Sequence, residues 1–381
     1  MRIAMMTDSY YPTRDGVVTS VAMIRKSLEN LGHEVWIVAP DPGIDERLED
    51  HNVLWLRSVN FRSYEGYYVP VLPSIDITRM RELDFDVIHI HGVATMAVRG
   101  LILAHFLKIP AVMTFHTMVG DVAYKYSPIK ISKDALDSLI WFYLKNIMKR
   151  MDAVVVPTDV IGREILEKTD KIRVLCTIPT GIDANVFHPG FDGDAFREKY
   201  NLGDGKKILH VGRISFEKEI DMAIRAMADI DAKLLVIGSG PQKEELEELT
   251  VKLGLEDKVR FLGFIPNKDL PDAYACGDML ISCSAFETQG LSVLEAMASG
   301  LPCACRNARA FTDIIRDGEN GFLFDGEEDC KDVILRCLRA SDSVKNASYE
   351  TALSYSAATS AEKTIGLYEK VIVAKKKRLE E

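Results

Sequence analysis

The sequence has no apolar run long enough to cross a membrane, no CxxC cysteine pair and no excess of basic residues. Its longest apolar stretches have the length of a buried strand, well short of the roughly 18 residues that a membrane-spanning helix needs. The first eight residues lack the apolar segment and cleavage site of a secretory signal, and they already have the pattern of a buried strand. These features predict a protein that stays in the cytoplasm.

The seven cysteines lie at positions 176, 276, 283, 303, 305, 330 and 337. Cys303 and Cys305 alternate within an apparent strand, which favours thiols packed as small core residues over disulfides or zinc ligands. We therefore predict no disulfide framework and no metal site.

The chain is too long for one ordinary hydrophobic core. It has 381 residues, 47% of them hydrophobic and 27% charged, and single cores stop growing at about 250–300 residues. Two domains of a globular protein are therefore expected. The net charge of −10 argues against a nucleic-acid partner, because such binding depends on a basic face that neutralises phosphates.

Short apolar runs alternate with helical patterns from residue 2 to about 330, which is typical of βα units that build parallel sheets. In the first half the predicted strands are 2–7, 35–39, 53–57, 87–91, 111–115, 153–156 and 172–178. In the second half they are 207–211, 233–238, 259–262, 279–282, 302–305 and 322–324. Ligands of such sheets bind beyond the carboxyl ends of the strands, so residues that follow a strand are the candidates for chemistry.

A turn-rich stretch from Pro179 to Gly190, followed by the polar segment 192–204, separates the two series of strands and suits a linker. We expect one domain over 1–190, a second over 191–360, and a C-terminal helix with a basic tail, 361–381, that packs back toward the first domain. The predicted fold class is α/β, with two Rossmann-like domains that face each other across a cleft.

Glu287 and Glu295 lie eight positions apart across a predicted strand-to-helix transition. Gly290 permits close backbone approach, and the amides of a helix that begins near Leu291 form a site for a diphosphate. Glu287 would face a sugar, and Glu295, on the first turns of the helix, can accept hydrogen bonds from both ribose hydroxyls. We assign Gln289, Gly290 and Leu291 to the same candidate site, which would bind the diphosphate and the sugar of a donor substrate. Such a pair of glutamates can also be ordinary helix-start acids that complement the helix dipole.

Two cations favour the first interpretation. Arg213 and Lys218 follow the first strand of the second half, where a helix opens. Arg213 offers a forked guanidinium and Lys218 a point charge, which suit a departing diphosphate. With the two glutamates they form half of a site for a nucleotide sugar.

The order and spacing of several motifs resemble the retaining glycosyltransferases of family 4, which have the GT-B fold. The motifs are Asp8-Ser9-Tyr10-Tyr11-Pro12, Asp15-Gly16-Val17, His89-Ile90-His91-Gly92, Thr114-Phe115-His116-Thr117, Pro179-Thr180-Gly181-Ile182-Asp183, Gly212-Arg213 through Lys218, Gly238-Ser239-Gly240-Pro241, and Glu287 to Glu295. This resemblance, which covers nearly the whole chain, implies transfer of a hexose from a nucleotide diphosphate sugar such as UDP-glucose or GDP-mannose. It implies no required cofactor.

The resemblance also implies a role for each matching residue. Arg213 and Lys218 bind the donor phosphates, Glu295 binds the ribose, and Glu287 binds the sugar ring. His116 binds a hydroxyl of the transferred sugar, and all but Glu295 are expected to be catalytic.

Histidines and a short acidic motif also follow or precede predicted strands. His116 closes strand 111–115, which places its imidazole at the carboxyl edge of the first sheet. We expect His89 and His91 to be buried beside the sheet, because no third metal ligand is evident. The motif Asp84-Phe85-Asp86 precedes its strand, on the wrong edge for a ligand, and is predicted to be a solvated turn.

Two loops complete the predicted donor site. Gly16 lies between the first strand and a helical pattern, and it can approach a sugar or an acceptor phosphate. The loop lacks GxGxxG, which gives little support to a dehydrogenase. After another strand, Phe264 and Ile265 lie in a loop whose backbone is suited to reading the edge of a base, and both UDP and GDP are left open.

By the same resemblance we favour front-face attack, in which an oxygen of the leaving phosphate accepts the proton of the acceptor. No strand end of the first half offers an obvious nucleophilic carboxylate. Arg213, Lys218 and the amides near Gly290 suit an oxocarbenium-like departure of diphosphate.

The helical pattern from Ser132 to Arg150 suggests how an acceptor is reached. Its core-facing stripe is predicted to hold Leu136, Leu139, Ile140, Tyr143, Leu144 and Ile147. This leaves an exposed Trp141 beside the cations Lys145, Lys149 and Arg150, which is typical of a helix on an anionic membrane. The aromatic loop 61–68, with Tyr64 and Tyr67, is assigned to the same surface. Aromatics packed under loops and solvated lysines explain these patterns equally well.

The motifs Thr114 to Met118 and Glu287 to Leu291 resemble most closely the branch with diacylglycerol glucosyltransferases and lipid mannosyltransferases. A membrane lipid is therefore the expected acceptor, with the enzyme peripheral on the inner face of the membrane. The alternative within the fold is a small soluble acceptor, such as a sugar or inositol phosphate. A nucleotide-sugar epimerase and a catalytically dead binding module are disfavoured by the glutamates and cations of the donor site. The oligomeric state is left open.

Overall fold

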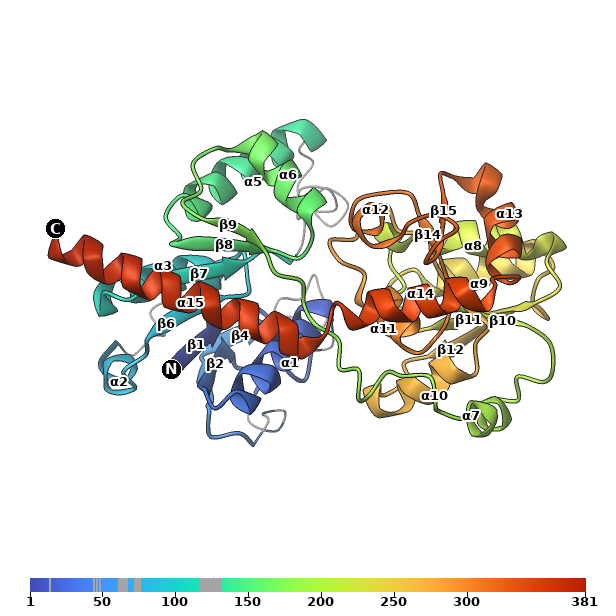
Figure 1. The fold of residues 1–381 in the computed structure, drawn as a ribbon, viewed down its shortest axis with the longest axis horizontal. Coiled ribbons are helices and arrows are strands. Elements are labelled where there is room, and N and C mark those ends of the chain that lie inside the picture. Colours follow the sequence, from blue (N-terminus) through green and yellow to red (C-terminus); the bar gives the residue numbers. More distant parts are fainter. Residues whose placement is uncertain are drawn as a thin grey trace. The chain divides into compact units, whose positions relative to one another are not determined.

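The computed structural model describes residues 1–381 apart from positions 14, 44, 46, 48, 61–67, 72–76 and 117–131. The chain divides into two compact units, Met1–Gly181 with Ala357–Glu381, and Ile182–Ser356. In each unit a sheet of parallel strands is covered by helices (Figure 1). The junctions fall at 181/182 and 356/357, whereas the sequence predicts them near 190 and 360.

In the first unit, seven of the described strands form one parallel sheet in the order β3-β2-β1-β6-β7-β8-β9. They are β1 (Arg2–Met6), β2 (Glu34–Pro40), β3 (Val53–Leu56), β6 (Val87–Ile90), β7 (Ala111–Thr114), β8 (Ala153–Val156) and β9 (Leu175–Thr177). Each overlaps a predicted strand, which confirms the βα alternation. Most read as continuous apolar runs because helices cover both faces of the sheet.

A short antiparallel pair lies outside this sheet and is not predicted from the sequence. Its strands are β4 (Ser58–Asn60) and β5 (Tyr68–Pro70). Three residues are too few for an alternating pattern to be recognised.

Helices pack on both faces of the first sheet. On one face α1 (Gly16–Asn30) and α15 (Ala357–Glu380) lie against each other (Figure 1). They share a core that includes Val21, Leu28 and Tyr368. The other face is covered by α2 (Ile77–Glu82), α3 (Thr95–Leu107), α5 (Lys133–Met148) and α6 (Asp159–Lys168). The C-terminal helix therefore belongs to the same unit as the N-terminal strand.

Asp8 joins the end of β1 to the start of α3. Its carboxylate accepts hydrogen bonds from the backbone N–H of Ala94 at 2.9 Å and of Met96 at 3.0 Å, which caps the helix. A glycine is needed at position 92, because a Cβ there would lie 2.0 Å from Asp8 Oδ2. This contact fixes the carboxyl edge where β1 and β6 end.

In the second unit, six of the described strands form a parallel sheet in the order β12-β11-β10-β13-β14-β15. They are β10 (Lys207–Val211), β11 (Lys233–Ile237), β12 (Val259–Gly263), β13 (Met279–Ser282), β14 (Cys303–Arg306) and β15 (Phe322–Phe324), and each was predicted. The α-helices are α7 (Asp194–Lys199), α8 (Ile220–Ala226), α9 (Lys243–Lys252), α10 (Leu270–Ala275), α11 (Leu291–Ala298), α12 (Ala310–Ile314), α13 (Glu327–Cys337) and α14 (Asp342–Leu353). Short 3-10 turns are η2 (Phe216–Lys218), η3 (Met227–Asp229) and η4 (Asn267–Asp269).

The segment 192–204, which the sequence suggests as a linker, is part of the second unit. It contains α7, and Phe196 and Leu202 lie in the core together with Ile182 and Phe187. Six of the thirteen residues of the segment are charged, and Phe196 and Leu202 are its buried apolar residues. Burial of a few side chains therefore outweighs its polar character.

The cysteines and the lengths of the helices agree with what the composition predicts. All seven cysteines are free thiols and six of them are buried, as predicted. None of the helices in the described part of the chain has both the length and the apolar character that crossing a membrane requires.

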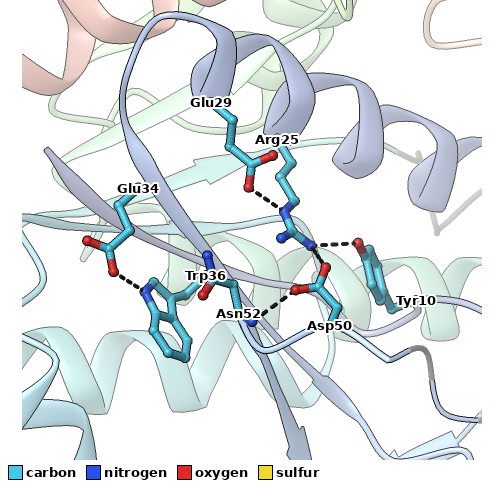
Figure 2. A network of polar contacts seen from close by, with 7 residues as sticks. All are labelled: Tyr10, Arg25, Glu29, Glu34, Trp36, Asp50 and Asn52. Atoms are coloured by element: carbon cyan, nitrogen blue, oxygen red, sulfur yellow. Dashed lines mark hydrogen bonds and ion pairs between the residues drawn. The ribbon is translucent and has the colours of Figure 1, made fainter.

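A polar network joins α1 to the chain that leads into β3 (Figure 2). Arg25 Nε donates to Glu29 Oε1 at 2.8 Å, and Arg25 Nη1 donates to Asp50 Oδ2 at 2.6 Å. The Arg25 side chain is only 12% exposed. Burial is the largest single effect on Asp50 and raises its pKa, but the hydrogen bonds from Arg25 and from the backbone N–H of Asn52, with the charge of Arg25, together outweigh it and lower the pKa of that carboxyl.

We expect Arg25→Leu to lower the free energy of unfolding of the first unit by about 2 kcal/mol, because it leaves Asp50 without its charged donor. All three tryptophans (Trp36, Trp55 and Trp141) lie in this unit, so urea denaturation followed by tryptophan fluorescence reports on it. Asp50 contributes this stability above its unfolded pKa, near 4, and loses it as the pH falls through its lower folded pKa. The difference between the chains therefore shrinks in acid.

Arg2→Leu is the matched control. Arg2 pairs with Glu34 at the surface, where an ion pair is worth less than about 1 kcal/mol. Equal losses in the two variants would contradict a special role for the Arg25 network.

Candidate functional site

Lys218 and Glu287 meet at the carboxyl edge of the second sheet. Lys218 ends η2, which follows β10, and Glu287 follows β13, the strand that pairs with β10. Lys218 Nζ donates to Glu287 Oε1 in a close ion pair. The side chains are 21% and 18% exposed, so the pair is largely removed from water.

Hydrogen bonds between the two loops support this pair. Ser284 Oγ donates to the carbonyl oxygen of Glu217 at 2.6 Å, and Ser215 Oγ donates to Glu217 Oε1 at 2.5 Å. Neither serine is assigned a role from the sequence. Their signal is a serine in the loop that follows each strand, where a hydroxyl can replace a missing backbone partner.

Gly290 forms the turn into α11, which begins at Leu291 as predicted. Its φ of +78° lies in the left-handed region, and a Cβ there would lie 2.5 Å from Phe311 Cε1. Gln289, beside it, is buried. The turn therefore starts α11 just after β13, at the carboxyl edge of the sheet.

Glu295 lies on α11 and forms a hydrogen bond with Tyr274, which no sequence motif indicates. Tyr274, on α10, is fully buried and donates its hydroxyl to Glu295 Oε2 at 2.8 Å. Burial raises the pKa of Glu295 to about 7, while the hydrogen bond from Tyr274 works in the opposite direction. A buried tyrosine requires a hydrogen-bond partner for its hydroxyl. A tyrosine expected to be buried, such as Tyr274, therefore predicts a polar partner nearby.

The loops after β10, β11 and β12 are joined by backbone hydrogen bonds. Gly212 N donates to Ile237 O at 3.0 Å, and Gly238 N donates to Gly263 O at 2.8 Å. A Cβ at Gly238 would lie 1.8 Å from Gly212 O. Glycine is therefore required at position 238, where the loops after β10 and β11 approach each other, and this close approach fixes the backbone position of Gly212, next to Arg213.

The remaining predicted residues of the second unit lie along the same edge. Arg213 is partly buried and directly follows Gly212. Phe264 is exposed, whereas Ile265 is buried in the core. The side chain of Ile265 therefore belongs to the core, and the backbone contact to a base stays a prediction.

Gly16 and His116 belong to the first unit, which is described by itself. Gly16 is exposed and is the first residue of α1, and Asp15 caps that helix by accepting from Val18 N at 2.8 Å. His116 follows β7, and its Nε2 lies 2.9 Å from His91 Nδ1. The structure brings Glu287 and Lys218 together within the second unit, and it brings His116 and His91 together within the first.

The two histidines at the end of β6 and the acidic motif before it lie where the sequence places them. His89 and His91 are buried, and Asp84 and Asp86 are exposed in a turn before β6. Among the described residues, no group of three His, Cys, Asp or Glu side chains is arranged to hold a metal ion.

The predicted exposure of Trp141 is wrong. Its side chain is 7% exposed and packs in the core with Leu144, and Lys168 Nζ lies 5.6 Å from its ring centroid. Leu139, predicted to be in the core, is 60% exposed, and Phe142 is 68% exposed. Leu144 and Ile147 are buried and Ile140 and Tyr143 pack against the core, as predicted. The apolar stripe of α5 therefore includes Trp141 at its edge and leaves out Leu139, because burying the large indole gains more than burying a leucine.

The cations of this helix and two aromatics complete the predicted acceptor surface. Lys149 and Arg150 are exposed and Lys145 is partly exposed. Tyr64 and Tyr67 lie outside the described residues.

Solved structures with the same architecture define the class. HepE of Anabaena in complex with UDP has a TM-score of 0.78 and 19% identity, and the match covers 97% of this chain and 100% of that chain. Sucrose-phosphate synthase of Thermosynechococcus elongatus has a TM-score of 0.79 and 21% identity, with 98% and 99% covered. The protein has the GT-B fold, as the motifs imply.

Sequence comparisons identify the family. The model described as Glycosyltransferase Family 4 matches residues 14–186, and that described as Glycosyl transferases group 1 matches residues 192–353. The alpha-monoglucosyldiacylglycerol synthase of Streptococcus pneumoniae is 32% identical, over 89% of this chain and 79% of that protein. A GDP-mannose-dependent alpha-mannosyltransferase of Corynebacterium glutamicum is 26% identical, over 85% and 77%. The chain belongs to family 4 of the glycosyltransferases.

The bond between Tyr274 and Glu295 generates a prediction. Tyr274→Phe removes a hydrogen bond that favours the carboxylate, so we expect the pKa of Glu295 to rise above 7. It is measured by carbon-13 NMR titration of the glutamate carboxyls, with the signal assigned from Glu295→Gln. Tyr349→Phe, on α14, is the control and leaves the titration unchanged. An unchanged or lower pKa in Tyr274→Phe would contradict the contact.

Proposed function

We propose that this glycosyltransferase transfers a hexose from a nucleoside diphosphate sugar to a membrane glycerolipid, with retention of anomeric configuration. The observation that carries the proposal is the Lys218–Glu287 pair, held beside the Gly290 turn at the carboxyl edge of the second sheet. The pair combines a cation that can bind phosphate with a carboxylate that can bind sugar hydroxyls, and both side chains are largely removed from water. The names of the diacylglycerol synthase relatives support the lipid acceptor.

Each group of the site suits a part of the donor. The Lys218 ammonium and the Arg213 guanidinium are suited to the diphosphate, and the amides that open α11 add hydrogen-bond donors. Glu295 is suited to the ribose, because its ionised form, which predominates above about pH 7, accepts from two hydroxyls. Glu287 is proposed to accept from hydroxyls of the sugar ring.

The proposed reaction is front-face substitution at the anomeric carbon. The bond to the diphosphate oxygen breaks, the acceptor oxygen forms its bond on the same face, and the acceptor proton passes to the leaving phosphate oxygen. Lys218 and Arg213 stabilise the negative charge that develops on that phosphate. Family 4 membership supports retention, and a glycosyl-enzyme adduct detected by mass spectrometry would overturn this route.

We expect Lys218→Met and Glu287→Gln to lower kcat about 100- to 1,000-fold, because each removes a charged group that acts on the departing diphosphate or the sugar ring. Turnover is measured with UDP- and GDP-sugars, each with vesicles that contain diacylglycerol, and NMR of the product gives its anomeric configuration. Lys252→Met, an exposed lysine on α9, is the control.

The outcomes separate the parts of the proposal. Full activity of both variants would contradict the donor site. Donor binding with transfer only to soluble sugar or inositol phosphates would retain the donor site and replace the acceptor. Inversion of the product would contradict retention.

Exposed apolar side chains on α3 and α5 support a lipid surface as the source of the acceptor. Val98, Ile102 and Phe106 lie along one side of α3, and Leu139 and Phe142 project from α5. Both helices cover the same face of the first sheet. With the exposed cations Lys149 and Arg150, they match the composition of helices that lie on anionic membranes.

We expect Phe142→Ser to weaken binding to phosphatidylglycerol vesicles by about tenfold or more, because it removes a large exposed apolar side chain from the bilayer contact. Binding is measured by vesicle flotation. Val251→Ser, an exposed apolar residue of α9 in the second unit, is the matched control. Equal binding of Phe142→Ser and the unaltered chain would contradict this surface.

A further inference from the structure

Three histidine rings lie in a row at the carboxyl edge of the first sheet. His89 is on β6, His91 directly follows it, and His116 follows the neighbouring strand β7. The ring centroids of His89 and His91 are 4.0 Å apart, and those of His91 and His116 are 5.2 Å apart. His91 Nδ1 and His116 Nε2 lie 2.9 Å apart, which is a hydrogen-bond distance.

One proton lies between these two nitrogens. Burial lowers the pKa of His116 to about 4 and that of His91 well below its usual value. Both rings are therefore neutral near pH 7, and each carries a single N–H. Either His91 Nδ1–H donates to His116 Nε2, or His116 Nε2–H donates to His91 Nδ1.

The other nitrogen of His91 decides between these forms. His91 is 2% exposed, and among the described residues its Nε2 has no hydrogen-bond partner. If His116 donated, this Nε2 would carry a buried N–H without an acceptor, which is rare in folded proteins. If His91 donates, its Nε2 carries no hydrogen and has only an acceptor lone pair. The form in which His91 donates is therefore favoured.

His89 holds the row from the other side. Its Nδ1 pairs with Tyr368 Oη at 2.5 Å, and its Nε2 pairs with Thr114 Oγ1 at 2.7 Å. Tyr368, from α15, is fully buried, and burial raises the pKa of its phenol. Because both nitrogens of His89 are in use, His89 does not satisfy His91 Nε2, and its packed ring fixes the plane of His91.

We propose that His91 is a positioning residue that donates its Nδ1–H to His116 Nε2 and so holds His116 in the Nδ1–H tautomer. The functional part rests on the proposed function, in which His116 contacts a hydroxyl of the transferred sugar. In this tautomer the Nε2 lone pair of His116 is already occupied. His116 therefore meets the hydroxyl as a hydrogen-bond donor that orients the sugar, and it does not act as a base.

Long-range proton–nitrogen NMR spectra of the full chain, labelled with nitrogen-15 histidine, measure the tautomer directly, with signals assigned from His116→Ala. We expect the Nδ1–H form of His116 in the unaltered chain and in His91→Asn, whose amide N–H replaces Nδ1–H. His91→Gln places its amide near the position of Nε2, and His91→Leu has no donor, so both populate the Nε2–H form. An Nε2–H His116 in the unaltered chain would overturn the proposal.

Turnover tests the positioning role. We expect His91→Leu and His91→Gln to lower kcat/KM by up to about tenfold, the effect of one lost neutral hydrogen bond. His91→Asn regains most of the activity, and His105→Leu, an exposed histidine of α3, is the control. Equal losses in His91→Asn and His91→Gln would overturn the positioning role, and this comparison remains valid where His91→Leu fails to fold.

The two proposals fail in different ways. If His116→Ala keeps full turnover, the sugar contact of the proposed function is overturned, and the functional part of this inference is overturned with it. The spectra of the free protein still report on the His91–His116 hydrogen bond in that case, because they need no substrate.

Discussion

The constraint on which both units depend is that all strands of each main sheet run in the same direction. Parallel strands end at one edge, so loops from distant parts of the sequence meet there. Lys218 and Glu287 are 69 residues apart and still form an ion pair, because β10 and β13 are neighbours in the sheet. His91 and His116 meet for the same reason after β6 and β7. Strand order, more than the chemistry of any one loop, determines which side chains can act together.

Crowding at these edges explains where glycine is required. In the second unit, a Cβ at Gly240 would lie 2.2 Å from Ile214 O, and one at Gly238 would overlap Gly212 O. In the first unit the space for a Cβ at Gly92 is filled by the carboxylate of Asp8. These glycines provide room for backbone and cap contacts, and the contacts in turn fix the loops that carry Arg213 and His91.

The sequence predicts the strands and assigns Lys218 and Glu287 to one site, because both inferences depend on local patterns and on the rule for parallel sheets. It does not predict which edge of the apolar stripe of α5 is buried, since apolar residues lie on both sides of the stripe in this helix. Trp141 and Leu139 exchange their expected environments as a result. The bond between His89 and Tyr368 spans 279 residues, and no local pattern contains such a contact. Tyr274 is missed for the same reason, because its partner lies on a different helix.

The Lys218–Glu287 pair also limits how a diphosphate can be accommodated. Two charges with about a fifth of their side-chain surface exposed compensate each other, and removing one partner leaves the other charge poorly solvated. If Lys218 turns toward phosphate, as proposed, Glu287 needs new hydrogen-bond donors, and hydroxyls of the transferred sugar are the groups that can supply them. A nucleotide sugar then gives Lys218 a phosphate and Glu287 the hydroxyls of the sugar. A nucleoside diphosphate without a sugar leaves the Glu287 carboxylate uncompensated. The ion pair thus couples recognition of the phosphate to recognition of the sugar, although each residue contacts a different part of the donor.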